Sequence, residues 1–255
     1  MRNHSRTIPI LLLSLLMVIL LGTETFGAIF NDPNVPDGEQ FVWRGIMPDQ
    51  EPIVSVVTWR VSGGEGRPVY EITTDAGERK QAKYIIDKSD LRLIHTHVIE
   101  QTSEGKFEMT ITVRDDRQYM VSEFENKTKD KDIEHQPDGY NGILLPFYLR
   151  GFPFDKQGEV KPKITVPVLP GKPLWVWKMW NSKVKFMGAE KVTVPAGTFD
   201  CYKLEVSASN WAIRRVTSEY YFWYTKEPPH RFVRFQDKDG DNITELLEIR
   251  STGKN

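Results

Sequence analysis

The amino-acid sequence predicts an all-β protein with at most one or two short helices, built as a strongly curved antiparallel sheet that forms a half-open or closed β-barrel. About 10–12 segments either alternate polar with apolar residues or are rich in β-branched and aromatic ones. Turn signals such as Asp75-Ala76-Gly77 and Asp239-Gly240 separate these segments. The sequence has neither long helical periodicity nor repeats of roughly 20–50 residues, so we expect one series of strands with mostly short connections.

The first 27 residues have the layout of a secretory signal. Two arginines precede an apolar run, Ile8–Leu21, and small residues follow it. This run of about 14 residues is shorter than the roughly 20 that span a bilayer. No cysteine stands directly after the run, so a lipobox for a bacterial lipid anchor is not indicated. We expect cleavage after Gly27, with Ala28 as the second choice, a periplasmic or otherwise exported protein, and no stable transmembrane span once the signal is removed.

The rest of the sequence is interpreted as one domain. Residues 28–40 contain a Pro/Gly/Asp cluster and are predicted to be a flexible lead-in. Residues 41–250 are predicted to form a single β domain, which is long enough to bury a sizeable core without disulfides, and residues 251–255 a tail. Cys201 is the only cysteine in the sequence, which excludes an intramolecular disulfide. It lies in a strand-like run, so we interpret it as a small buried apolar residue.

Strand patterns occur along this whole domain. Ile53–Val61 is rich in β-branched residues, and Phe107–Val113 alternates apolar with polar residues. Tyr202–Val206 repeats the alternation, and Ile243–Ile249 follows it less regularly. The proline-rich stretch 160–173 is interpreted as an edge strand or a connection, because proline cannot donate a hydrogen bond to a ladder.

The segment Ile143–Phe154 is almost entirely apolar and interrupts the strand pattern. It is compatible with a short helical turn that has Pro146 near its start and Gly151 as its cap. A connector this apolar must be covered by protein, by ligand or by membrane. Arg150 is its sole charge before Asp155, and a guanidinium beside an apolar pocket would suit a carboxylate or phosphate headgroup. The alternative is that Arg150 reaches water or pairs with Asp155.

Aromatic residues gather in two further segments. Trp175, Trp177 and Met179 share one face of a strand whose other face also carries a tryptophan, and a second group lies at residues 220–224. Such residues form either a filled aromatic core or the wall of a cavity for an apolar or amphiphilic ligand. The cavity interpretation gives a set of predicted ligand-binding residues: Trp175, Trp177, Met179, Tyr148, Arg150 and Trp223.

The run Lys191–Val206 joins two strand-like segments through a Pro-Ala-Gly-Thr-Phe-Asp turn. Pro195 fixes its own φ and Gly197 can adopt a positive φ, so we interpret the motif mainly as a structural corner. Together with Tyr148-Leu149-Arg150 and the aromatic group at 220–224, this run resembles the bacterial exported family catalogued as domain of unknown function 3108, most clearly over residues 175–249. The resemblance implies an envelope protein with a curved β architecture and supplies no catalytic residues.

Two motifs match the sequence patterns of metal-binding sites in part. His95 and His97 would point to the same face of a strand, a spacing used by metal sites, but zinc needs a third ligand. Leu91, Leu93 and Ile99 are expected on that face as well, so we favour two histidines satisfied by hydrogen bonds. The segment 237–242 partly matches a calcium loop, but its glycine stands at the fourth position, and we interpret it as a hairpin turn.

The charge balance and the absence of certain sequence motifs argue against several classes of function. The sequence has 34 Lys and Arg against 35 Asp and Glu, so it lacks the excess of positive charge that is typical of nucleic-acid-binding proteins. No nucleophile elbow or phosphate-binding loop occurs, and we predict no cofactor. The leading hypothesis is a non-enzymatic envelope protein that binds a hydrophobic or lipid-like ligand in the cavity of its curved sheet, around residues 143–154. The alternatives are a structural or protein-interaction module of the envelope with a filled aromatic core, and a metal-dependent hydrolase that uses His95 and His97.

Overall fold

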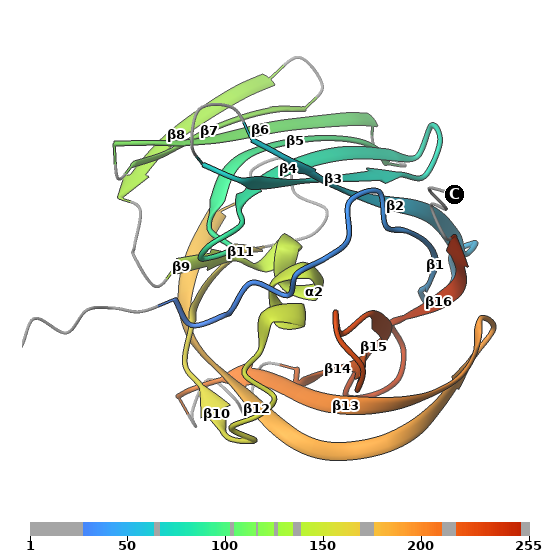
Figure 1. The fold of residues 1–255 in the computed structure, drawn as a ribbon. Coiled ribbons are helices and arrows are strands. Elements are labelled where there is room, and N and C mark those ends of the chain that lie inside the picture. The colour runs from blue at the N-terminus through green and yellow to red at the C-terminus, as the bar shows by residue number, and fades with distance from the viewer. Residues whose placement is uncertain are drawn as a thin grey trace, which may run out of the picture.

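The computed structural model describes residues 28–63, 67–102, 105–115, 117–124, 127–134, 139–168, 176–210 and 218–250. The predicted signal, residues 1–27, and the predicted tail, residues 251–255, lie outside these residues. The described chain forms one 16-stranded sheet that curves around a short helical segment (Figure 1). The all-β fold class with very little helix is therefore confirmed.

The strands are β1 (Gln40–Ile46), β2 (Ile53–Ser62), β3 (Val69–Asp75), β4 (Lys80–Asp87), β5 (Leu93–Thr102), β6 (Gly105–Arg114), β7 (Arg117–Phe124), β8 (Lys127–Glu134), β9 (Gly139–Asn141), β10 (Glu159–Val160), β11 (Lys163–Val168), β12 (Val176–Val194), β13 (Gly197–Ala208), β14 (Tyr220–Thr225), β15 (Phe232–Asp237) and β16 (Ile243–Arg250).

The sheet is mostly a meander that bends around a central space. Its strand order is β8-β7-β6-β5-β4-β3-β2-β1-β16-β15-β14-β13-β12-β11-β9, and β10 pairs with β12 beside this path. The pairing of β9 with β11 is parallel, and neighbours elsewhere along the meander are antiparallel. Strand β1 pairs with both β2 and β16, so the first and last strands lie side by side. The two ends of the order, β8 and β9, do not pair within the described residues, which makes the barrel half-open (Figure 1).

Alternation along the strands decides which face is buried. In β6, Phe107, Met109 and Ile111 are buried and the residues between them are not, and β7 alternates in the same way over its whole length. The corner between β12 and β13 consists of two residues after Val194, and Gly197 beyond it has a φ of +132°. Glycine adopts this conformation without strain, as the turn motif predicts.

The structure has more strands than the sequence predicts. Strand β8 alternates lysine with polar or acidic residues and carries little apolar character, while β9 and β10 span three and two residues. Neither a strand with a single apolar residue nor a very short one produces the apolar period on which the prediction of about 10–12 strands depended.

A helical segment fills the concave side of the sheet (Figure 1). It consists of a 3-10 turn η1 (Gly142–Leu144), a one-turn helix α2 (Leu145–Tyr148) and a second 3-10 turn η2 (Leu149–Gly151). Pro146 lies in the first turn of α2, where its missing N–H has no intrahelical partner to lose. The predicted helical turn is therefore present. Within the described residues, no helix combines the length and the apolar character needed to cross a membrane.

Phe147 anchors this helical segment in the core. Its ring lies 5.7 Å from that of Trp43, 5.6 Å from that of Trp59 and 5.9 Å from that of Tyr84, measured between centroids. The hydroxyl of Tyr224 adds a hydrogen bond of 2.9 Å to the carbonyl oxygen of Pro146. The apolar connector is thus covered by the protein's own sheet, which satisfies the first of the three possibilities that its composition left open.

Residues 28–39, which make up most of the predicted lead-in (28–40), place several side chains in the core beside this helical segment. Phe30 is fully buried and stacks on Tyr148, with ring centroids 6.5 Å apart. The backbone N–H of Val35 donates to the hydroxyl of Tyr70 at 3.1 Å. Pro, Gly and Asp indicate irregular backbone, and an irregular backbone can still be held by its side chains, so the flexibility of the lead-in stays a prediction.

Gly151 allows these two segments to meet and does not serve as the expected helix cap. Its carbonyl oxygen accepts a hydrogen bond of 2.7 Å from the backbone N–H of Asn31. A Cβ atom built on Gly151 would lie 2.0 Å from the carbonyl oxygen of Asn31. Only glycine lets the two backbones approach this closely.

Candidate functional site

A buried ion-pair cluster joins the start of β1 to the helical segment. Arg150 Nη2 donates to Glu39 Oε2 at 2.8 Å, and Arg231 Nε donates to Glu39 Oε1 at 2.8 Å. Arg150 Nε also donates to the carbonyl oxygen of Pro229 at 3.2 Å. Arg150 is 1% exposed and Glu39 is 6% exposed. The guanidinium that the sequence offered to a ligand headgroup is therefore engaged inside the protein, and its partner is Glu39 and not water or Asp155.

Aromatic rings complete the surroundings of Arg150. Its guanidinium carbon lies 4.9 Å from the ring centroid of Trp59 and 5.5 Å from that of Phe41, within cation–π range. Burial lowers the pKa of Arg150, and the negative charge of Glu39 opposes this effect. Arg150 Nη1 and Trp59 Nε1 have no acceptor within the described residues. Donors therefore outnumber acceptors, and we interpret the cluster as a structural clamp that depends on both oxygens of Glu39.

A half-open cavity of about 330 Å³ lies at the opposite end of β1. Gln40 at the start of β1 pairs with Arg250, whereas Ile46 at its end pairs with Ile243 beside the cavity. The volume falls within the range of about 300–1,000 Å³ that is usual for small-molecule sites. The lining residues are Gly45, Ile46, Met47, Tyr220, Phe235, Asn242, Ile243 and Thr244.

This cavity opens on the concave side of the sheet. Thr244 stands opposite Gly45 in β1 and opposite Phe235 in β15, so all three residues face the same side. Phe235 stacks on Tyr220, with ring centroids 5.9 Å apart, and packs against the buried Phe222 at 5.1 Å. The apolar wall of the cavity is therefore continuous with the hydrophobic core.

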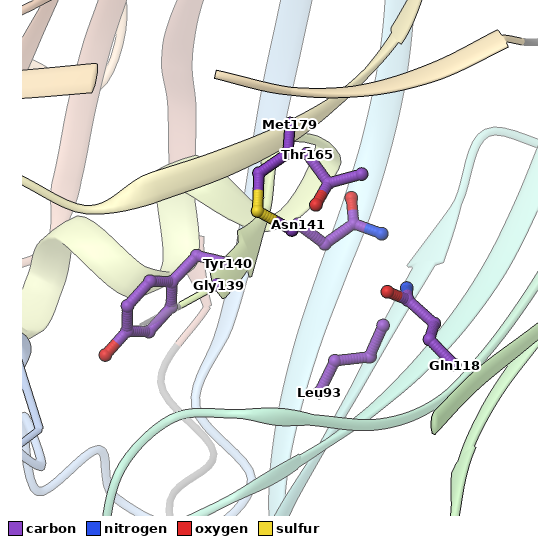
Figure 2. Close-up of a pocket in the computed structure, with 7 residues that line it drawn as sticks. All are labelled: Leu93, Gln118, Gly139, Tyr140, Asn141, Thr165 and Met179. Atoms are coloured by element: carbon purple, nitrogen blue, oxygen red, sulfur yellow. The ribbon is translucent and has the colours of Figure 1, made fainter. Parts of the chain in front are cut away.

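A much smaller pocket lies where the two ends of the open sheet approach each other (Figure 2). Leu93 of β5 and Gln118 of β7 stand on one side, and residues 139–141 of β9, Thr165 of β11 and Met179 of β12 stand on the other (Figure 2). Its volume of about 10 Å³ holds roughly one water molecule. The seam between the sheet ends is thus nearly filled by side chains.

The structure separates the predicted ligand-binding residues instead of gathering them at one site. Tyr148 and Arg150 are buried in the interior, whereas Met179 is 40% exposed at the seam. Trp175 and the side chain of Trp177 lie outside the described part of the chain. None of the described members lines the cavity of about 330 Å³, so ligand contact by this set stays a prediction.

Trp223 lies on the convex side of β14, apart from the interior residues. Its strand neighbours Phe222 and Tyr224 face the core, and alternation turns Trp223 the other way. Its Nε1 donates to Glu190 Oε1 at 2.6 Å, and the ammonium of Lys203 lies 4.8 Å from its ring centroid. These contacts bury the indole to 6% exposure and account for it without a ligand.

His95 and His97 are held by hydrogen bonds on the convex side of β5. His95 Nδ1 lies 3.2 Å from Thr112 Oγ1, and His97 Nε2 lies 2.9 Å from Glu108 Oε1. Burial lowers the pKa of His95, and the nearby charge of His97 lowers it further. Within the described residues, no group of three His, Cys, Asp or Glu side chains is placed to hold a metal ion.

Of the apolar neighbours expected around these histidines, Ile99 shares their side, whereas Leu91 and Leu93 are buried in the core. A β-bulge places Leu93 opposite Ile86 and His95 opposite Ile85, so one extra residue lies between the two pairs. The extra residue reverses the alternation, and Leu93 is buried while His95 is partly exposed. A bulge leaves no signal in the sequence period, which is why the expectation was wrong for Leu93.

The segment 237–242 forms the hairpin turn between β15 and β16 that the sequence predicts. Asp237 Oδ1 accepts hydrogen bonds from the backbone N–H groups of Asp241 at 2.9 Å and Asn242 at 3.2 Å. Burial is the largest single influence and raises the pKa of Asp237, but the hydrogen bonds from the side chain and backbone of Asn242 and from the backbone of Asp241 together lower it. The carboxylate is therefore used to shape the turn.

Cys201 is fully buried, as its strand-like context predicts, and its Sγ contacts the carbonyl oxygen of Phe199 at 3.6 Å. Burial raises the pKa of the thiol to about 12. We expect a disulfide reagent at pH 8 to modify the native protein at least about a hundredfold more slowly than the urea-unfolded protein, because thiolate is the reactive form. The absorbance of the released thiol measures both rates, and equal rates would contradict a buried thiol.

Sequence reasoning missed Glu39 and most of the cavity. Glu39 lies in an irregular segment with no periodic signal, and its partners Arg150 and Arg231 are far away along the chain. The cavity forms where β1, β14, β15 and β16 meet, and only the aromatic group at 220–224 pointed toward it. The register between the first and last strands is what brings these residues together.

The family model described as "Protein of unknown function (DUF3108)" matches residues 51–247. No curated protein matches the chain. A solved structure from Brucella abortus, described as a β-barrel-like protein of domain of unknown function DUF1849, is similar to the chain with a TM-score of 0.50 and 8% sequence identity. The match covers 85% of this chain and 99% of the Brucella chain, and it concerns the fold alone.

Two further solved structures resemble the chain more distantly. A Bacteroides fragilis protein thought to be exported, with a YmcC-like fold, has a TM-score of 0.34 and 13% identity, over 88% of this chain and 100% of that one. A Parabacteroides distasonis protein thought to be a lipoprotein has a TM-score of 0.30 and 16% identity, over 88% of this chain and 99% of that one.

Proposed function

The chain belongs to the DUF3108 family of proteins of unknown function, and from that premise we propose that it is an exported, non-enzymatic envelope protein that binds a hydrophobic or lipid-like ligand. The ligand binds in the half-open cavity at the end of β1. This differs from the space beside residues 143–154 that the sequence favoured, because those residues occupy that space themselves.

The observation that carries this proposal is the apolar wall formed by the stacked rings of Tyr220 and Phe235. Wide rings provide contact area, and the nearby Asn242 and Thr244 provide polar groups that orient a ligand. At about 25 cal/mol per Å², burying roughly 250 Å² of ligand surface contributes about 6 kcal/mol before the cost of immobilisation. This favours micromolar or weaker binding of a small apolar molecule.

Filling the cavity is expected to abolish ligand uptake without disturbing the fold. Gly45 faces the cavity, and a Cβ atom built on it meets only the carbonyl oxygen of Ile53, at 3.8 Å. We expect Gly45→Leu to weaken binding of the fluorescent probe N-phenyl-1-naphthylamine by about tenfold or more, which corresponds to roughly 1.4 kcal/mol. A fluorescence titration measures the affinity, and circular dichroism checks the fold.

Val54→Leu is the matched control for this experiment. Val54 is 49% exposed, and it stands opposite Arg44, one residue away from Gly45 and therefore on the other side of the sheet. The control adds apolar volume next to the cavity without entering it, so probe affinity should not change. Equal binding by both variants, or a lack of uptake by the unmodified protein, would argue against the cavity. Native mass spectrometry of protein purified from its own envelope would then identify the natural ligand.

A second candidate function is supported by the filled interior. Residues 28–39 and 142–154 occupy the concave side of the sheet with buried aromatic side chains, which favours a structural or protein-interaction module of the envelope. Under this function the cavity at the end of β1 would take up no apolar probe, and specific envelope proteins would be recovered with the chain after cross-linking.

A further inference from the structure

Strand β8 has its charges sorted by face. Residues that pair across an antiparallel ladder point to the same side, and the register of β7 with β8 therefore fixes the direction of each side chain. Lys131 stands opposite the buried Met120, and Lys127 stands opposite the buried Phe124, which places the lysines on the concave side. Lys129 lies between them, opposite Ser122. The acidic residues of the strand fall on the convex side: Asp130, Asp132 and Glu134.

Among the described residues, no acidic side chain pairs with the lysine row. Lys127, Lys129 and Lys131 are all exposed and make no ion pair within the described residues. The side chains beside them on the concave side of β7 are neutral: Gln118, Met120, Ser122 and Phe124. On the convex side, in contrast, Asp132 Oδ1 accepts a hydrogen bond of 2.7 Å from Arg117 Nε. The concave side of β8 is therefore a positively charged stripe that three alternate positions create.

The second edge of β8 is not paired with any strand in the described part of the chain. Figure 1 shows β8 at the outer end of the layer formed by β5, β6 and β7. An unpaired edge offers a row of backbone N–H and C=O groups to a further strand, and charged side chains restrict which strand can add. A strand added at this edge would be held by backbone hydrogen bonds and selected by side-chain charge.

A second copy of β8 is a poor partner. Two copies that pair antiparallel about a two-fold axis keep their concave sides together, so lysines meet lysines and acidic residues meet acidic residues. Like charges opposite each other destabilise a ladder. The sorting therefore disfavours antiparallel self-association through this edge.

We propose that β8 is a docking edge for an extended segment of another protein in which acidic side chains alternate with basic ones. When such a segment adds as a strand, its acidic side chains lie beside Lys127, Lys129 and Lys131, and its basic side chains lie beside the acidic residues of the convex side. The proposal is independent of ligand binding at the end of β1, because β8 and that cavity have no residue in common.

The test uses the full mature chain and a fluorescent eight-residue peptide of alternating Glu and Lys, equal in length to β8. Fluorescence anisotropy is expected to show saturable binding. The triple variant Lys127→Glu, Lys129→Glu and Lys131→Glu is expected to bind the peptide at least about tenfold more weakly. A control triple variant, Lys156→Glu, Lys161→Glu and Lys191→Glu, changes the net charge equally at exposed sites away from β8 and should retain the affinity.

Two further peptides separate strand addition from simple charge attraction. A peptide of the same charge with a central proline cannot complete a ladder and should bind at least about tenfold more weakly. A peptide of glutamates alone places acidic groups beside Asp130 and Asp132 and should also bind more weakly. The proposal is overturned if the alternating peptide does not bind the unmodified chain, if all three peptides bind equally, or if the two triple variants lose affinity equally.

Discussion

Replacing Glu39 with alanine is expected to lower the free energy of unfolding by about 3–5 kcal/mol. The change leaves Arg150 buried with no counter-charge, and it also removes one partner of Arg231. Arg150 is too deeply buried for water to replace the lost carboxylate, so the full cost of an unpaired, desolvated charge lowers the free energy of unfolding. Urea unfolding followed by tryptophan fluorescence measures the effect, because the buried ring of Trp59 lies 4.9 Å from the guanidinium carbon of Arg150.

Two companion variants test the cause of this loss. Asp200 pairs with Lys191 at 3.4 Å at the surface, where both side chains are more than half exposed, so Asp200→Ala should change the stability by about 1 kcal/mol or less. The double variant Glu39→Leu with Arg150→Met removes both buried charges and should recover most of the stability. A Glu39→Ala loss no larger than that of Asp200→Ala would contradict a buried clamp.

Gly151→Ala is expected to destabilise the protein by about 3 kcal/mol or more. The new Cβ would lie 2.0 Å from the backbone oxygen of Asn31 and 2.9 Å from Leu91 Cδ1. A backbone atom cannot move aside like the end of a flexible side chain, so residues 28–39 would have to shift and the bond from Asn31 to Gly151 would be lost. Urea unfolding measures the stability, and hydrogen exchange at the N–H of Asn31 reports the local change.

The matched control for this substitution is Gly158→Ala. A Cβ built on Gly158 meets only the carbonyl oxygen of Lys156, at 3.7 Å, an ordinary contact. Its effect should stay within about 1 kcal/mol, with either sign, because alanine also restricts the unfolded chain. Similar losses in the two variants would mean that the close approach at Gly151 does not matter.

The sequence predicts the fold class well because alternation is a local signal. In strands such as β6 and β7, the alternation of apolar and polar residues shows which side is buried, and short turns then favour a meander. The prediction fails where structure depends on distant partners. Residues 28–39 have no period, and their path depends on contacts with β2, β3, β9 and the helical segment. Strand β8 has no apolar face and is a strand only because β7 is next to it.

The candidate site was harder to predict than the fold for a related reason. The sequence identified Arg150 as an unusual charge in an apolar segment, but the identity of its partner depends on the path of residues 28–39. The apolar segment itself was correctly identified as needing cover. Local composition cannot distinguish a segment that lines an empty space from one that fills it, and side-chain packing decided between them here.

The pairing of β1 with β16 has a consequence for the time at which the protein can fold. Gln40 must find Arg250, about 200 residues away, so the sheet is incomplete until nearly the whole domain is available. Such high contact order slows folding, and the strands on either side of this joint remain without a shared core until it forms. Under the proposed export through a secretion channel this delay is useful, because translocation requires an extended polypeptide and the last strand completes the sheet only after it has emerged.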